Sequence, residues 1–179
     1  MDYLQQILSE VTIMAPSMGA IFAIALAAIL LLFSGFASGS EIAFFSLTPN
    51  DINELEESNS EKDKRILELR EDSERTLATI LIANNVINVT IIMLCNYFFD
   101  HVVNFGAAVW LQFLVITILL TFLLLLFGEI MPKVYCGQHA LAMCRAFCDS
   151  IFLLRKLFRP LANILLRSGA LSGKVVQTD

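Results

Sequence analysis

Charged residues are absent from three long stretches of this 179-residue chain. No Asp, Glu, Lys or Arg occurs from Val11 to Ser40, from Thr76 to Phe99, or from Val102 to Gly128. A helix of about 20 apolar residues crosses the hydrocarbon core of a bilayer, and each stretch is longer than that. The pattern therefore predicts an all-α integral membrane protein with three transmembrane helices. We expect these spans at about 18–47, 77–98 and 107–129.

The segments beside the predicted spans are polar or amphipathic. Residues 51–75 favour helix, and Asn59 and Ser60 can divide them into two short helices. Their partial apolar stripe is formed by Ile52, Leu55, Ile66 and Leu69. Residues 134–166 mix basic and apolar side chains without a further uninterrupted span. We therefore expect cytoplasmic juxtamembrane amphipathic helices, the second set forming a collar on the inner leaflet.

Helix boundary signals frame the first span. Ser17 is compatible with the start of that helix, and the sequence Thr48–Pro49–Asn50 is expected to stop it. Residues 168–179 contain Gly and Ser and are typical of a linker or a fraying tail. We expect a membrane domain at residues 1–167, followed by a linker at 168–179 toward a cytosolic region that this chain lacks.

Composition and charge agree with a membrane location. The chain is 57% hydrophobic and has a mean hydropathy of +0.72, which excludes an ordinary soluble domain. All twelve Lys and Arg residues lie between the first two spans or after the third. Basic loops stay on the cytoplasmic side, so we expect a multi-pass protein of the cell (inner) membrane with its N-terminus outside and its C-terminus inside.

The remaining composition narrows the function classes. The formal net charge is −5, and the basic residues are interspersed with acidic ones in a mixed-charge face, which we expect to be solvated by cytosol. We therefore expect no nucleic-acid partner, because the chain has no basic stripe. Four cysteines could suggest zinc, but their spacing fits no paired-Cys template, and packing of small apolar groups explains them better. They are Cys95, Cys136, Cys144 and Cys148.

Polar side chains recur inside the spans, where they are costly unless they meet each other, water or an ion. Ser34, Ser38 and Glu41 share one face of the first span, because residues four and seven apart align on a helix. Gly35 and Gly39 lie beside them at a spacing that permits close helix packing. The serines could instead hydrogen-bond back to carbonyls of their own helix, and the glycines could serve packing alone.

The other two spans carry matching polar groups. The second contains Asn84, Asn85 and Asn88 in an otherwise apolar series, where they could bind a metal or form interhelical hydrogen bonds. In the third, Pro132 has no amide hydrogen for the Gly128 carbonyl, so we expect a local break that frees this oxygen. Hydroxyl, carboxamide, carboxylate and carbonyl oxygens select a hard cation. Ligand type alone does not separate Mg²⁺ from Na⁺ or Ca²⁺.

Three segments of the chain together resemble a known family, that of bacterial CorC-type proteins and animal cyclin-M (CNNM) magnesium transport mediators, which share the DUF21 transmembrane domain. The segments are Ser34–Gly–Phe–Ala–Ser38–Gly–Ser–Glu41–Ile–Ala, Leu77–Ala–Thr–Ile–Leu–Ile–Ala–Asn84–Asn85 and Phe127–Gly–Glu129–Ile–Met–Pro132–Lys133. Ala83 departs from the family, in which many members have Gly before the Asn pair. One bacterial branch is associated with gliding motility and secretion, and the context of Met131 and Tyr135 is similar to it.

The resemblance implies a homodimer of three-helix domains with an inward-opening cavity that holds Mg²⁺. Matched position by position, the metal ligands would be Ser34, Ser38, Asn84, Asn85, Asn88 and Glu129. Residues beside the ligands or in gating would be Glu41, Gly128, Pro132 and Lys133. In the family, ATP binds a cytosolic pair of CBS modules, which this chain lacks.

Two functions remain open at this point. The first is Mg²⁺ transport by alternating access, with export as the expected direction and inward Na⁺ movement as a coupling option. The alternative is a non-transporting membrane scaffold, or a Mg²⁺ sensor of a secretion or gliding machinery. We do not expect an enzyme, because His101 lies on the predicted opposite side from the carboxylates and His139 lies beyond Pro132.

Overall fold

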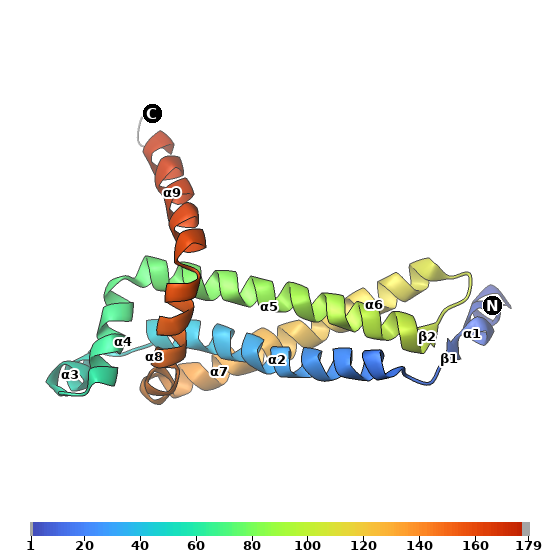
Figure 1. Cartoon of the computed structure of the whole chain (residues 1–179), viewed down its shortest axis with the longest axis horizontal. Helices are drawn as coiled ribbons and strands as arrows, with labels where there is room; N and C mark the ends of the chain where they lie inside the picture. Colours follow the sequence, from blue (N-terminus) through green and yellow to red (C-terminus); the bar gives the residue numbers. More distant parts are fainter. Residues whose placement is uncertain (1, 177–179) are drawn as a thin grey trace.

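The computed structural model describes residues 2–176, with side chains as far as residue 169. Most of this part of the chain is helical (Figure 1). The elements before the second span are α1 (Asp2–Glu10), β1 (Thr12–Ile13), α2 (Met18–Phe45), α3 (Pro49–Glu57) and α4 (Glu61–Glu71). The remaining elements are α5 (Ser73–Val102), β2 (Val103–Asn104), α6 (Val109–Leu123), the π-helix η1 (Leu124–Ile130), α7 (Met131–Gln138), α8 (Ala140–Leu157) and α9 (Arg159–Val176).

The three predicted spans are confirmed. Among the described residues, three helical stretches are long and apolar enough to cross a membrane: α2, α5, and the continuous run of α6, η1 and α7. Helices α2 and α5 lie side by side along the long axis of the molecule (Figure 1), and η1 and α7 pack against α2. All three stretches reach beyond the charge-free segments. Polar residues extend them at the end of the bundle where the Lys and Arg residues lie.

The packing of the spans is that of a membrane protein. The buried positions of α2 are almost all Ala, Gly or Ser, whereas its large side chains, such as Leu32, point outward. Phe113 and Ile118 of α6 are likewise exposed. Small residues at helix contacts let backbones approach closely, and large apolar residues are then left to face lipid.

The boundaries of α2 are partly as expected. Ser17 caps its start, because the Ser17 hydroxyl accepts a hydrogen bond from the amide of Ala20 at 3.1 Å. The predicted stop signal was wrong in its role: α2 already ends at Phe45, and Thr48 begins the next helix. Thr48 and Asp51 form a capping box with Pro49 in the first turn of α3, so these residues initiate α3 instead of terminating α2.

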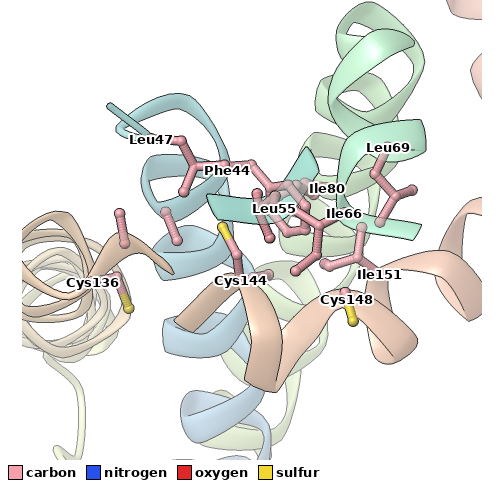
Figure 2. Packing of buried hydrophobic residues seen from close by; sticks show 13 residues of the cluster. Phe44, Leu47, Leu55, Ile66, Leu69, Ile80, Cys136, Cys144, Cys148 and Ile151 are labelled. Atoms are coloured by element: carbon pink, nitrogen blue, oxygen red, sulfur yellow. The ribbon is translucent and has the colours of Figure 1, made fainter. Parts of the chain in front are cut away.

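The juxtamembrane helices form a hydrophobic cluster with the basic end of the bundle. The predicted division at Asn59 and Ser60 is confirmed, since α3 and α4 are separate helices on either side of it. Figure 2 shows their apolar side chains meeting α2, α5 and α8. The labelled members are Phe44, Leu47, Leu55, Ile66, Leu69, Ile80, Cys136, Cys144, Cys148 and Ile151. Three of the four cysteines lie in this cluster, and Cys95 lies in a second buried cluster, so all four act as small apolar packing groups, as expected.

The mixed-charge face is largely exposed, as expected, with one buried exception at Asp63. Asp63 of α4 is only 4% exposed, and Arg145 of α8 donates to both of its carboxylate oxygens at 3.1 Å. Arg145 also donates to Glu54 of α3 at 3.0 Å. Hydrogen bonding to Arg145 holds the pKa of Asp63 below its usual value. Asp63 and Glu54 therefore fasten the short helices to α8, while most other charged side chains of residues 51–75 are exposed, as expected.

The opposite end of the molecule contains a short β pair that the sequence pattern did not predict. Thr12 pairs with Asn104 and Ile13 with Val103 in antiparallel register. The amide of Met14 extends this contact by donating to the Val102 carbonyl at 2.7 Å. The segment before α2 is thereby tied to the turn between α5 and α6.

Helices α8 and α9 follow the third span, and both pack against α5. Figure 1 shows α9 running across the long axis of the bundle. The segment 134–166 that the sequence assigned to an amphipathic collar therefore consists of the end of α7, all of α8 and the first part of α9. Helix α9 continues through Val176 and so includes part of the proposed linker 168–179. Residues 177–179 of that linker lie outside the described residues, and its connection to a further domain stays a prediction.

Candidate functional site

Three polar oxygens from α2 and α5 converge in the interior of the bundle. The Ser34 hydroxyl is fully buried and donates toward Asn88 Oδ1 at 2.6 Å and Asn84 Oδ1 at 3.1 Å. Asn84 and Asn88 lie one turn apart on α5, so both carboxamides reach the same serine. The sequence placed these residues on matching faces, and the structure brings them together.

The third span approaches the same point through Gly128 of η1. A Cβ atom at this position would lie 3.1 Å from Ser34 Oγ and 3.8 Å from Ser34 Cβ. The absence of a side chain at Gly128 therefore lets the backbone of η1 come close to the serine. All three spans meet at Ser34.

Ser38 lies one turn further along α2 and differs from its neighbour Ser40. Both are buried, but the Ser40 hydroxyl donates back to the carbonyls of Phe36 and Ala37. The Ser38 hydroxyl has no hydrogen-bond partner among the described residues. A buried hydroxyl without a partner is costly, so Ser38 is the side chain here that most clearly calls for an additional ligand. Back-bonding explains Ser40 but neither Ser34 nor Ser38.

The expected break at Pro132 is wrong, because the third span continues through it as a helix. Its hydrogen bonds widen to the π type in η1, where the amide of Met131 donates to the Leu126 carbonyl five residues earlier. If this i→i−5 pattern continued by one residue, the Phe127 carbonyl would accept a hydrogen bond from the amide of residue 132. Residue 132 is proline and has no N–H to donate. Pro132 therefore leaves the Phe127 carbonyl without this donor, and the predicted freeing of the Gly128 carbonyl stays a prediction.

The glycines of α2 provide the close helix contact that their spacing predicted. A Cβ at Gly35 would lie 3.0 Å from Pro132 Cγ and 3.4 Å from the Phe127 carbonyl oxygen. A Cβ at Gly39 would lie 2.5 Å from Cys136 Sγ, which is shorter than any normal contact. Gly35 and Gly39 therefore hold η1 and α7 directly against the serine-bearing helix.

The candidate acidic residues occupy different surroundings. Glu129 is half-buried in η1, next to Gly128, and makes no ion pair with a described residue. Glu41 of α2 forms an ion pair with Lys133 of α7, at 3.6 Å between Oε2 and Nζ. Lys133 thus compensates Glu41, whereas the contribution of the Glu129 carboxylate to the site at Ser34 stays a prediction.

Asn85 is not joined to this group. Its side chain is exposed, one position away from Asn84, on another face of α5. Its role as a ligand stays a prediction, and a partner for it would have to approach from outside the three-helix unit.

The donor chemistry of the site is that of a hard cation. The converging groups are hydroxyl and carboxamide oxygens, and no group of three or more His, Cys, Asp or Glu residues in the described part of the chain is arranged to hold a metal ion. Oxygens bound to Mg²⁺ at about 2.0–2.1 Å in an octahedron lie about 2.9 Å apart. The separations of 2.6 and 3.1 Å around Ser34 are close to this value, but they are also ordinary hydrogen-bond lengths and therefore do not by themselves indicate an ion.

The fold and this site define the class of protein: a polytopic helical membrane domain whose spans meet at a buried cluster of oxygen donors. Sequence comparison gives the family. The model of the cyclin M transmembrane N-terminal domain (CNNM) matches residues 25–177, and the chain belongs to this family.

Individual relatives come from animals and bacteria. The chain is 33% identical over 111 residues to the metal transporter cnnm-4 of Caenorhabditis elegans, covering 59% of this chain and 22% of that protein. It is 30% identical over 138 residues to a UPF0053 protein of Haemophilus influenzae, covering 76% of this chain and 31% of the relative. A UPF0053 protein of Synechocystis is 28% identical over 144 residues, with coverages of 76% and 38%. The matched regions thus span less than two fifths of these relatives.

Proposed function

We propose that this chain is the membrane domain of a Mg²⁺ transporter, with Mg²⁺ as the cargo of the site at Ser34. The observation that carries the proposal is the convergence of the Ser34, Asn84 and Asn88 oxygens beside the unpartnered Ser38 hydroxyl. Family membership supports it, because relatives such as cnnm-4 are named metal transporters.

In this proposal each side chain has a distinct role. Ser34, Asn84 and Asn88 replace oxygens of the hydration shell of Mg²⁺, and Ser38 supplies a further oxygen one helical turn away. Glu129 contributes negative charge from η1. A Mg²⁺ ion between these groups would replace the hydrogen bonds of Ser34 by coordination and give the Ser38 hydroxyl a partner.

The transport cycle is also a proposal. We place the opening of the cavity toward the basic, cytoplasmic end and assign export by alternating access, with inward Na⁺ movement as the coupling reaction. Three spans make a thin bundle, and a homodimer would cover more of its exposed apolar surface and offer Asn85 a partner. The resemblance of the motifs supports these assignments.

A second function is favoured by one specific observation. The hydrogen bonds from Ser34 to Asn84 and Asn88 join α2 to α5 by themselves, as polar groups do in membrane bundles that bind no ion. In that case the protein would be a membrane scaffold or a sensor, and the polar groups would hold the spans in register.

Thermal unfolding of the purified protein in detergent separates the two functions. Mg²⁺ is titrated at constant ionic strength, with Na⁺ and Ca²⁺ in parallel. A ligand that binds only the folded state stabilises it by about 2.7 kcal/mol at a hundredfold excess over its Kd. We expect saturable stabilisation by Mg²⁺ that is strongly weakened in Glu129→Gln and Asn84→Ala.

Asn85→Ala is the matched variant, because it removes the same carboxamide one residue away. Weakening by Asn84→Ala but not by Asn85→Ala would place the site where the oxygens converge. Equal destabilisation by Asn84→Ala with and without Mg²⁺, together with no ion-specific shift in the wild type, would reject the transporter and favour the scaffold. Mg²⁺ flux into or out of proteoliposomes, measured with a Na⁺ gradient in either direction, then tests direction and coupling.

A further inference from the structure

A basic pocket lies at the junction of α4, α5, α8 and α9, apart from the site at Ser34. It encloses about 370 Å³ and is lined by Glu68, Arg75, Phe152, Arg155, Lys156 and Arg159. Four of these six residues are cationic, and only one is acidic. The pocket therefore has the charge expected of a site for an anionic group.

Neighbouring acids neutralise this charge only in part. Asp72 Oδ2 accepts a hydrogen bond from Arg155 Nη2 at 3.3 Å and lies 3.2 Å from Arg75 Nε. The contact with Arg75 is an ion pair without hydrogen-bond geometry, so Arg75 Nε has no hydrogen-bond partner among the described residues. Arg155 Nη1 is also buried and has no such partner. Lys156 and Arg159 are exposed at the rim and form no ion pair with a described residue.

Phosphate is the anion that suits these donors best. A guanidinium group presents several N–H donors in a planar fork that matches the oxygens of a phosphate. Two arginines with unused buried N–H groups can each offer such donors, while Lys156 and Arg159 add charge at the opening. Each unused donor is costly where it is buried, and a bound phosphate oxygen would remove that cost.

The position of the pocket distinguishes a lipid headgroup from a free phosphate compound. Arg75 immediately precedes the charge-free stretch of α5, so the pocket lies at the level where headgroups meet acyl chains. Beside it, Leu153 and Leu157 of α8 and Leu161 and Ile164 of α9 are between 49% and 68% exposed. A helix that runs across the bundle axis with an exposed apolar face is typical of the membrane interface (Figure 1). Acyl chains would cover this face, whereas a free phosphate compound would leave it bare.

We propose that this pocket binds the headgroup phosphate of an anionic phospholipid from the adjacent leaflet. The bound lipid joins α9 to the start of α5 through its phosphate and lays its chains along the exposed leucines. Because the pocket lies apart from Ser34, this site is independent of the proposed Mg²⁺ site.

Lipid titration of the detergent-purified protein, followed by native mass spectrometry, tests the proposal. The probes are phosphatidylglycerol and phosphatidylcholine with identical chains, and inorganic phosphate and ATP serve as competitors. We expect tighter binding of phosphatidylglycerol that weakens as salt is raised. Each basic residue near an anionic headgroup contributes about fivefold in affinity, so Lys156→Gln with Arg159→Gln is expected to weaken binding about 25-fold.

Arg167→Gln is the matched control, because Arg167 is an exposed arginine of α9 outside the pocket. Lys156 and Arg159 are chosen over Arg155 since their replacement leaves the ion pairs of Asp72 intact. Equal affinity of wild type, the double variant and Arg167→Gln would overturn the site, as would equal binding of phosphatidylcholine. Displacement of the lipid by inorganic phosphate or ATP at comparable concentration would show a free-phosphate site and overturn the lipid assignment.

Discussion

Ser38→Ala is expected to have opposite effects in the absence and in the presence of Mg²⁺. The Ser38 hydroxyl is buried without a hydrogen-bond partner among the described residues, and such a group costs about 1–3 kcal/mol. Without Mg²⁺, its removal should therefore leave the free energy of unfolding unchanged or raise it by up to about 2 kcal/mol. With Mg²⁺, the variant lacks one oxygen of the proposed site.

The loss of that oxygen should weaken Mg²⁺ binding by about tenfold or more, which corresponds to about 1.4 kcal/mol. The variant should thus start from a melting temperature equal to or above that of the wild type and gain less from a given Mg²⁺ concentration. Thermal unfolding in detergent over a Mg²⁺ titration measures both quantities in one experiment. The starting temperature reports the cost of the hydroxyl, and the concentration dependence reports the Kd.

Ser40→Ala is the control for this prediction. Ser40 is equally buried two residues away, but its hydroxyl donates to carbonyls of its own helix. Its replacement should change the stability by less than about 1 kcal/mol and leave the Mg²⁺ dependence unchanged. If Ser38→Ala and Ser40→Ala show the same Mg²⁺ dependence, Ser38 is not a ligand and the reasoning from its unpartnered hydroxyl fails.

Three further predictions concern packing between α2, α7 and the juxtamembrane helices. Asp63→Asn should cost about 1.5–3 kcal/mol at neutral pH, because it weakens the paired hydrogen bonds from Arg145. The pKa of Asp63 is lowered from 3.8, so its stabilisation of the fold is complete above this value and is lost as the pH falls through the lower folded-state pKa. In urea unfolding, the difference in stability between wild type and Asp63→Asn should therefore shrink below pH of about 4. A difference that stays constant would contradict the assignment. Gly39→Ala should destabilise the protein by about 1–3 kcal/mol, because the new methyl group clashes with Cys136 Sγ. The double variant Gly39→Ala with Cys136→Ala should regain stability. Gly169→Ala, whose methyl group meets no atom within 4 Å, should have no such cost. Burial raises the pKa of Cys144 to about 12, so alkylation of this thiol at pH 8 should require unfolding; rapid labelling of the native protein, detected by mass spectrometry, would disprove the buried position.

The arrangement of the spans could be predicted from the sequence because a bilayer imposes a simple rule. Absence of charge over more than about 20 residues identifies a span without knowledge of its neighbours. Asn84 and Asn88 are four residues apart and therefore share a face of their helix. Their approach to a polar residue of another span was expected for this reason. Which residue they would meet depends on the relative rotation and height of two helices, and this is set by packing alone.

The parts that escaped prediction depend on contacts between distant segments. Asp63 and Arg145 are separated by 82 positions, and nothing in the local pattern relates one to the other. The β pair at the opposite end involves two residues in each strand, which is too short for a recognisable alternation. At Pro132 the rule used was correct for an α-helix, but the preceding turns are π-helical, so Pro132 deprives the Phe127 carbonyl of a donor, which the sequence pattern did not indicate.

The widened turns of η1 fix the rotational phase of everything that follows them. A residue removed from an α-helix turns the remainder by about 100° around the helix axis. The π-helical turns of η1 hold about one residue more than α-helical turns would, so a one-residue deletion within Leu124–Ile130 that restored ordinary α-helical turns would leave nearly the same side of α7 facing α2. A one-residue deletion between Pro132 and Cys136 has no such extra residue to remove, and it would turn Cys136 away from Gly39, against which it now packs. Single-residue deletions should therefore be better tolerated by the interface within η1 than within α7.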